Sequence, residues 1–114
     1  MPFSEIELYK IKKIVGSLCK KRSPAHIIDQ LQVDYKIQNQ DIIIFEILPQ
    51  WNDPKKQIES PFAKLKFVRN RNHWKLYWHR ADMKWHKYEP FESSRDLAEL
   101  VKEIDTDQHG CFFG

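Results

Sequence analysis

Long hydrophobic runs are missing from this chain of 114 residues. The longest uninterrupted apolar run, Ile42 to Phe45, is far shorter than the roughly 20 residues that a helix needs to cross a bilayer. The N-terminal segment MPFSEIELYK also lacks the basic start and the apolar stretch of a secretory signal peptide. We therefore expect a soluble cytoplasmic protein without a membrane partner.

Cysteine is scarce as well. Cys19 and Cys111 are the only two cysteines, and they stand far apart in no metal-ligand spacing. This usage is typical of a reducing compartment rather than of a disulfide framework. The sequence leaves open whether the two thiols approach each other, because they would do so only if the C-terminal tail packs on the first helix.

Zinc patterns and catalytic motifs are absent too. The histidines and Cys111 match no common zinc spacing such as C-x2-C or H-x3-H. Glu46 lies in the apolar segment IIIFEIL and is the most unusual carboxylate, but an ion pair with Lys36 or Lys64 on a neighbouring strand would explain it. We can assemble no nucleophile, base and oxyanion site. We therefore predict no enzyme, no metal site and no cofactor.

The chain does contain one unusual segment, residues 62–88. It holds three of the four tryptophans and three of the five histidines. Its eight Lys and Arg residues against one acidic residue, Asp82, give it a formal charge of +7, so the other residues sum to −4 and the whole chain to +3. This charge permits a polyanion partner without requiring one.

Capping boxes and apolar residues at helical spacing predict one helix near each end of the chain. The S-x-x-E pattern of residues 4–7 precedes a segment of helical periodicity and predicts a helix over residues 5–21. The S-x-x-D pattern of residues 93–96 predicts a second helix over 94–105. The expected apolar faces consist of Leu8, Ile11, Ile14, Val15, Leu18 and Cys19 in the first helix and of Leu97, Leu100, Val101 and Ile104 in the second.

Alternation of apolar and polar residues predicts an initial hairpin. Residues 31–37 alternate strictly and form the first strand. A three-residue turn at 38–40 would set Phe45 opposite Val33 and bury both on one common face.

A second hairpin and a fifth strand follow in the tryptophan-rich segment. Folding the chain there sets Phe67 opposite Trp74 on one buried face. The register of the last strand, KWHKY, is ambiguous, because loops of different length exchange the faces of Trp85 and His86. We prefer the register that buries Trp85 against Trp78, since tryptophan is buried more often than histidine.

These elements predict an α+β fold in a single domain, residues 1–114: an N-terminal helix, a five-stranded, mostly antiparallel sheet built from hairpins, and a C-terminal helix packed on one face. Residues 50–61 have turn chemistry without periodicity and predict a long loop. We expect Trp51 to be a lid over the core, with an exposed contact as the alternative. The apolar end of residues 106–114 predicts a tail docked on the body.

Four motifs stand out from the rest of the chain. They are MPFSEIE at the start, the F-E-x-x-P-x-W segment of residues 45–51, the block WKLYWHRADMKWHKYEP, and the terminal D-x-x-G-C-F-F-G of residues 107–114. Together they resemble a small bacterial family catalogued as domain of unknown function 3024, and the tryptophan-rich block is the most specific part. The resemblance spans nearly the whole chain. It implies a single-domain protein and assigns no activity and no catalytic residue.

The second hairpin separates a core side from a side rich in lysine and aromatic residues. Sheets that bind single strands use aromatic rings for base stacking and cations for phosphates, so we interpret the protein as a small binding module for single-stranded RNA or DNA. Surface lysines that merely solubilise a sheet are the simpler explanation. The alternative function is a protein-protein interaction or accessory module, and a homodimer that covers this side is left open. The candidate ligand-binding residues are Lys64, Lys66, Arg71, Lys75, Tyr77, His79, His86 and Trp51.

Overall fold

The fold consists of one antiparallel sheet and two helices. The computed structural model describes residues 3–27 and 31–113, so the outermost residues of the N-terminal motif, of the C-terminal motif and of the predicted tail lie outside the described residues. Within these residues, neither helix has the length and apolar character to cross a membrane. The helices are α1 (Glu5–Lys21) and α2 (Leu97–Thr106), and the strands are β1 (Gln32–Gln38), β2 (Asp41–Gln50), β3 (Asp53–Val68), β4 (His73–His79), β5 (Trp85–Lys87) and β6 (Ser93–Ser94). Short 3-10 helices lie at Ala25–Ile27, Arg69–Arg71 and Glu89–Phe91.

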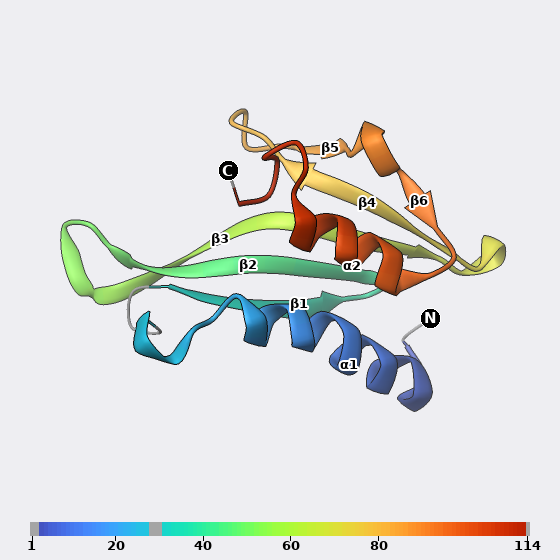
Figure 1. The fold of residues 1–114 in the computed structure, drawn as a ribbon, viewed down its shortest axis with the longest axis horizontal. Coiled ribbons are helices and arrows are strands. Elements are labelled where there is room, and N and C mark those ends of the chain that lie inside the picture. The colour runs from blue at the N-terminus through green and yellow to red at the C-terminus, as the bar shows by residue number, and fades with distance from the viewer. Residues whose placement is uncertain (1–2, 28–30, 114) are drawn as a thin grey trace.

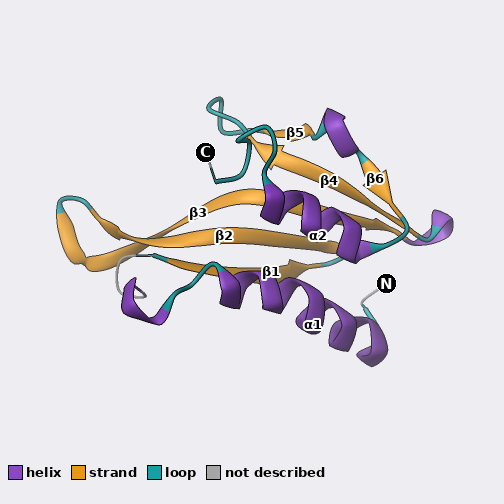
Figure 2. Ribbon diagram, in the orientation of Figure 1, coloured by secondary structure: helices purple, strands orange, loops and turns teal. Residues whose placement is uncertain are grey.

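Both helices lie on the same face of the sheet (Figure 1; Figure 2). The strands follow the order β1-β2-β3-β4-β5, and the short β6 pairs with β4. Side chains from the two helices and from alternate strand positions form one buried cluster between the layers. The predicted α+β class is confirmed, with β6 as an additional strand. The main strand residues in the cluster are Val33, Ile42, Ile44, Ala63, Leu65, Phe67, Trp74 and Leu76.

α1 begins and ends where the sequence predicts. Ser4 Oγ accepts the Glu7 backbone N–H at 3.2 Å, and a Glu7 carboxylate oxygen accepts the Ser4 N–H at 2.8 Å, which completes the capping box. Leu8 lies one turn before the buried face and is 41% exposed, so its predicted burial is wrong. The buried face consists of Ile11, Val15, Leu18 and Cys19.

α2 begins at Leu97 rather than at residue 94. Its N-cap is Asp96, whose carboxylate accepts the Ala98 N–H at 3.0 Å. Ser93, the predicted cap, instead belongs to β6 and pairs with β4. Aspartate and serine cap helices about equally well, so the sequence could not rank the two candidates. The predicted buried face of α2 is confirmed at all its positions, Leu97, Leu100, Val101 and Ile104.

The register of the first hairpin differs from the prediction by one residue. Val33 pairs with Glu46 instead of Phe45, because the turn between β1 and β2 holds two residues rather than three. The first turn residue, Asn39, has φ 57°, a left-handed conformation that asparagine tolerates. A slip of one residue exchanges the two faces of a strand. Ile44 therefore points into the core, and Phe45 points to the other side of the sheet.

The prediction of a long loop over residues 50–61 is wrong. β2 and β3 are joined directly by a turn at Trp51–Asn52, and Leu48 pairs with Ile58 beyond the helix-covered area. Neither α1 nor α2 covers this part of the sheet, and the side chains whose burial the structure describes are half-buried or exposed there, so no apolar alternation marks these strands in the sequence. We call residues 48–58 the arm, and it projects past the rest of the sheet (Figure 1).

The second hairpin, β3 with β4, has the predicted register, with Phe67 opposite Trp74. The two rings are 4.8 Å apart, and Phe3 stacks on Trp74 at 5.7 Å. The segment before α1 is thus anchored on the sheet by aromatic contacts. The connection between the strands is a short 3-10 turn that ends at Asn72 with φ 50°.

The preferred register of β5 is wrong. Trp85 pairs with His79, and His86 pairs with Trp78, so Trp85 and His86 exchange the faces that we expected. The loop before β5 places Asp82 against His86, with a carboxylate oxygen 2.8 Å from Nε2. This polar partner stabilises a half-buried histidine, a contact that a preference for burying tryptophan does not take into account.

The C-terminal tail is fixed to the body by Asp107. Its carboxylate accepts the backbone N–H groups of Phe112 at 3.0 Å and of Phe113 at 2.9 Å. Phe112 is buried with its ring 5.0 Å from that of Tyr88, and the guanidinium of Arg22 lies 4.0 Å from the ring of Phe113. The tail therefore packs on the body as far as Phe113.

The two cysteines are free thiols. Cys19 is buried in α1, and Cys111 is half-buried in the tail. Burial, reinforced by the nearby Asp34 carboxylate, raises the pKa of the Cys19 thiol to about 12. The two residues form no disulfide.

Asp105 links the two helices. Its carboxylate lies 2.6 Å from Lys21 Nζ and 3.0 Å from Arg22 Nη2, at the end of α1. Arg22 also donates to the backbone oxygen of Asp105. The hydrogen bond from Lys21, followed by that from Arg22, lowers the pKa of Asp105 below its ordinary value of 3.8.

We predict that the Asp105 link stabilises the protein at neutral pH and is lost in acid. Because the pKa is lowered in the folded state, the contribution is complete above 3.8 and disappears as the pH falls through the lower folded value. At pH 7, Asp105→Asn should lower the free energy of unfolding by about 1 kcal/mol. Urea unfolding of both proteins over a pH series should show the two stabilities converging in acid.

The control for this experiment is Asp41→Asn, because Asp41 forms no ion pair among the described residues. Its difference from the wild type should not converge in the same way. A stability difference for Asp105→Asn that stays constant from pH 7 to strong acid would contradict the assignment of the link to the ionised carboxylate.

We also predict that Asp107→Ala destabilises the protein by about 2 kcal/mol, because two partly buried N–H groups lose their acceptor and alanine disfavours the left-handed conformation at φ 48°. Asp107→Asn should cost less, since asparagine keeps an acceptor oxygen and tolerates this conformation. Thermal or urea unfolding measures both, with Gln108→Ala in the same turn as the control. Equal effects of Asp107→Ala and Gln108→Ala would refute this role.

Candidate nucleic-acid interface

The sheet face opposite the helices, the open face, carries its own group of side chains. Successive strand residues point to opposite faces, so alternate residues of β3, β4 and β5 share this face. From residue 64 onward and apart from Val68, these residues include four lysines and no carboxylate. We call them the basic-aromatic face, and they are Lys64, Lys66, His73, Lys75, Tyr77, His79, Trp85 and Lys87.

Lys64 is at the centre of the basic-aromatic face. Its Nζ lies 5.4 Å from the centroid of the Tyr77 ring and 5.6 Å from that of Trp85. The ring of His79 meets that of Trp85 edge-on at 4.9 Å. Cations are attracted to the faces of aromatic rings at such distances. The contacts hold Tyr77 and Trp85, both half-buried, in fixed positions on the surface of the sheet.

A hollow of about 170 Å³ adjoins the Tyr77 ring. It lies between β4, β5 and β6, and Lys75 and Lys87 line it together with Ser93 and Glu92. His73 also lines it, and the buried His73 Nε2 has no hydrogen-bond partner among the described residues. The hollow thus combines two ammonium groups and a hydroxyl, which are groups that bind phosphate oxygens, with one carboxylate, that of Glu92.

Most of the predicted ligand-binding residues come together on this face. Lys64, Lys66, Lys75, Tyr77 and His79 all belong to it. Arg71 lies in the exposed turn between β3 and β4, at one end of the face. His86 does not belong to it, because the observed register of β5 turns this residue to the other side.

Trp85 and Lys87 are functional candidates that the sequence analysis missed. They face the open side only because β5 pairs with β4 in the register that we had not preferred. The alternative loop length was the one signal in the sequence that could have found them. The observed register of β5 thus adds a second large aromatic ring, Trp85, and a fourth lysine, Lys87, to the basic-aromatic face.

Trp51 is not a lid over the core, so our preferred interpretation of it is wrong. It lies at the tip of the arm and is 92% exposed. Ile58 on the same arm is 46% exposed. The arm projects past the helices, so Trp51 at its tip does not take part in the buried cluster (Figure 1).

The expected ion pair of Glu46 with Lys36 or Lys64 is also wrong. The observed register turns Glu46 to the helix-covered face, where it lines a cavity of about 440 Å³ with Arg22. Burial raises the pKa of Glu46. Lys36 instead pairs with Glu59 at 3.2 Å and lies over the ring of Phe45.

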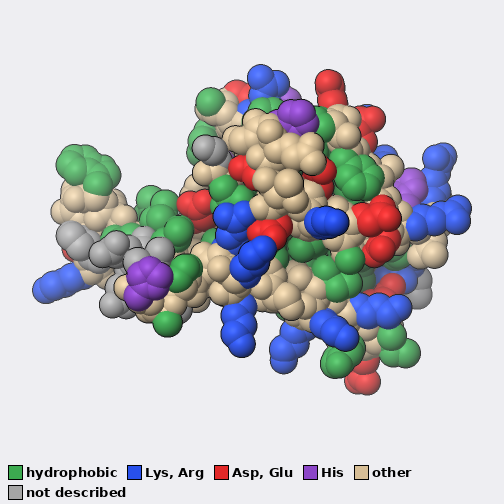
Figure 3. All heavy atoms as spheres, viewed as in Figure 1, with side chains coloured by type: hydrophobic (Ala, Val, Ile, Leu, Met, Phe, Trp, Pro, Cys, Tyr) green, Lys and Arg blue, Asp and Glu red, His purple; other side chains and the backbone are tan. Residues whose placement is uncertain are grey.

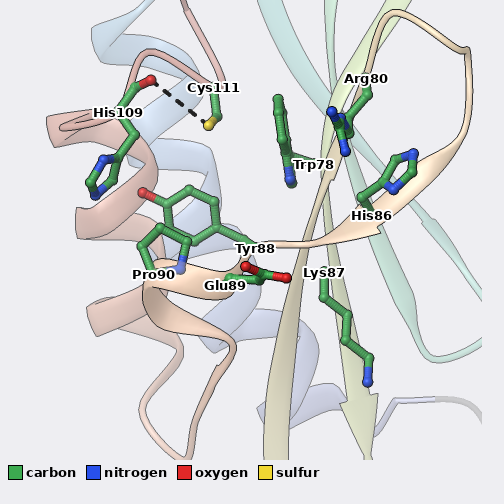
Figure 4. Close-up of a pocket in the computed structure, with 9 residues that line it drawn as sticks. All are labelled: Trp78, Arg80, His86, Lys87, Tyr88, Glu89, Pro90, His109 and Cys111. Atoms are coloured by element: carbon green, nitrogen blue, oxygen red, sulfur yellow. Dashed lines mark hydrogen bonds between the residues drawn. The ribbon is translucent and has the colours of Figure 1, made fainter.

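A larger cavity, the edge pocket, lies beside β5 and the C-terminal tail (Figure 4). It has a volume of about 520 Å³ and receives His86. Figure 4 shows the Trp78 ring standing between Arg80 on one side and the tail on the other. The residues that line the edge pocket are Trp78, Arg80, His86, Lys87, Tyr88, Glu89, Pro90, His109 and Cys111.

The helix side of the molecule has a different charge distribution. Figure 3 shows Lys and Arg side chains mixed with Asp and Glu side chains over this side. Ion pairs across it include those of Asp105 with Lys21 and Arg22. A surface of one charge sign is therefore a property of the basic-aromatic face rather than of the helices.

A comparison with protein-family models assigns the chain to one family. The family model described as "Domain of unknown function (DUF3024)" matches residues 3–114. The chain belongs to this family. The resemblance noted in the sequence is thereby confirmed, and the description of the family names no activity. No curated protein and no solved structure matches the chain.

Two of the motifs that resemble the family meet in the structure. The tryptophan-rich block forms β4, the following loop and β5, and the terminal motif forms the tail that Asp107 fixes. Both contribute to the edge pocket, the former with Trp78 and Tyr88 and the latter with His109 and Cys111. The basic-aromatic face draws on the same block.

Over residues 3–27 and 31–113, no three His, Cys, Asp or Glu side chains gather as metal ligands would. Burial, together with the Asp107 carboxylate, raises the pKa of the Cys111 thiol. This thiol is therefore protonated at neutral pH, which makes it a poor nucleophile.

Proposed function

We propose that the basic-aromatic face binds single-stranded nucleic acid. The observation that carries this proposal is the placement of Lys64 Nζ between the rings of Tyr77 and Trp85, at 5.4 and 5.6 Å. One ammonium group thus lies beside two half-buried rings. The basic-aromatic face itself has four lysines and no carboxylate, and Asp41 of β2 stands opposite Lys66 at its border. Bases stack on such rings, and the neighbouring lysines neutralise phosphates.

The geometry favours a single strand over a duplex. Strands β3, β4 and β5 together span about 10 Å, the width over which a sheet can stack two or three bases. A duplex keeps its base faces stacked inside and offers only groove edges and phosphates. The hollow beside Tyr77, with Lys75, Lys87 and Ser93, is a suitable place for a backbone phosphate.

We predict micromolar binding of a labelled single strand of about 12 nucleotides, measured by fluorescence anisotropy. The variant Lys64→Glu, Lys66→Glu, Lys75→Glu should lose binding, because it places three carboxylates where phosphates would lie. Affinity should fall steeply with salt, by about 0.7 in log–log slope for each phosphate contacted. Trp85→Ala should weaken binding by roughly tenfold or more through loss of stacking.

The matched control reverses three exposed lysines of α1, in the variant Lys10→Glu, Lys12→Glu, Lys13→Glu, which changes the net charge equally on the other side of the molecule. Binding should survive this change. Absence of binding to RNA and DNA at low salt would refute the proposal. If both triple variants lose the same amount of binding affinity, the net charge of the protein and not the basic-aromatic face would explain the binding.

A second candidate function is protein binding by the arm. Trp51 is 92% exposed and Ile58 46% exposed, and large apolar side chains at such positions are typical of contact residues. β1 covers β2 only as far as Ile47, and β4 covers β3 only from Ala63. Among the residues that the structure describes, neither edge of the arm is covered by another strand, so its backbone groups can add one.

The partner that best fits this edge is a second copy of the chain. An antiparallel pair of two β3 edges centred on Gln57 would set Lys55 of one copy opposite Glu59 of the other, on both sides of the centre. Opposite charges at facing positions stabilise such a pair. The exposed Trp51 of each arm would then contact the partner.

We predict concentration-dependent dimerisation in sedimentation velocity, weakened about tenfold by Trp51→Ala, because an interface tryptophan often contributes more than 1 kcal/mol. The matched control is Tyr9→Ala, since Tyr9 is an aromatic residue of α1 that is 68% exposed. It should leave the association unchanged. A monomer at every concentration tested would rule out a second copy as the partner.

A further inference from the structure

The edge pocket is separate from the basic-aromatic face. Trp78, His86 and Tyr88 reach it from the helix-covered side of β4 and β5, and His109 and Cys111 close it from the tail. Its volume of about 520 Å³ lies within the range typical of small-molecule sites. The strand residues and the tail residues that line it are distant in the sequence, so the pocket forms only in the folded protein.

The charges around the edge pocket favour an anion. Arg80 is exposed and forms no ion pair among the described residues. Its guanidinium lies over the Trp78 ring, 5.2 Å from the centroid, so its position is fixed while its N–H groups remain available. His86 and His109 add imidazole groups, whereas the Lys87 side chain extends away from the pocket (Figure 4). Glu89 is the one carboxylate in the lining. Asp82 lies outside the lining and contacts His86 at 2.8 Å.

The other walls favour a flat, uncharged part of a ligand. Trp78 and Tyr88 supply ring surfaces, and Pro90 supplies an apolar edge. The Tyr88 hydroxyl donates to Glu103 at 2.7 Å, so it is already occupied. The Cys111 thiol stays protonated because burial raises its pKa. Glu89 can accept a hydrogen bond from an N–H group at the rim of such a ring.

We propose that the edge pocket binds a small anion that carries a flat ring and has the size of a nucleoside monophosphate. The ring stacks against Trp78 on the side of the tail, and the anionic group reaches Arg80. Stacking on tryptophan and a fork of guanidinium donors are the two contacts that recognise this chemistry. The proposal does not rest on nucleic-acid binding by the open face, because its two principal contacts, Trp78 and Arg80, do not belong to the basic-aromatic face.

The test is an NMR titration of the ¹⁵N-labelled protein with AMP and with CMP. Phosphate alone and adenosine alone serve as partial probes. Signals of the Trp78 indole and of the His109 and Cys111 amides should shift and saturate at submillimolar nucleotide. Each partial probe should bind about tenfold more weakly or worse, because it makes only one of the two contacts. No shift at any of these sites with millimolar nucleotide would overturn the proposal.

Variants separate this pocket from the open face. Arg80→Gln removes an exposed cation and should weaken nucleotide binding about tenfold or more, whereas Lys84→Gln in the same loop lies outside the lining and should not. Thermal melting confirms that both variants fold. Nucleotide shifts confined to Tyr77 and Trp85, or an affinity unchanged by Arg80→Gln, would overturn the edge pocket while leaving the open-face proposal intact.

Discussion

The one-sided burial of the sheet is the constraint on which the rest of the structure depends. α1 and α2 cover one face, so the hydrophobic effect selects apolar residues at every second strand position there. The other face has no helix to pack against and must be compatible with water. Lysine stems and aromatic rings meet this requirement together, as Lys64 does with Tyr77 and Trp85. Phe45 follows the same rule, since Lys36 lies over its ring.

The C-terminal tail gives the terminal motif of the family a structural explanation. Asp107 has a left-handed backbone conformation, and its carboxylate accepts hydrogen bonds from two backbone N–H groups of the tail. Gly110, with φ 66°, donates its N–H to the Asp107 backbone oxygen at 3.1 Å. Glycine adopts this φ without strain. The resulting turn brings Phe112 onto Tyr88 and Cys111 to the wall of the edge pocket. A short polar motif thus completes both the core and a cavity.

β5 connects the two candidate sites. It turns Trp85 and Lys87 toward the basic-aromatic face and His86 toward the edge pocket, because successive residues of a strand point to opposite faces. A three-residue edge strand therefore contributes to both surfaces. The tryptophan-rich block combines structural and candidate binding residues in one continuous stretch. This combination explains how so many aromatic residues can occur together without overfilling the core.

The sequence by itself determined both helices, the α+β class and the β3–β4 hairpin, because strong local signals coincide there. The capping box fixes the start of α1, and Phe67 and Trp74 bury together in one register only. Five of the predicted binding residues accordingly lie on one face.

Tertiary structure decided what those signals leave undefined: the faces of Phe45 and Trp85, the arm, and the edge pocket. A turn shorter by one residue moves Phe45 out of the core, and the arm has no apolar period because no helix covers it. The pocket exists only because the tail returns to β5, a contact between distant parts of the chain that no local pattern encodes.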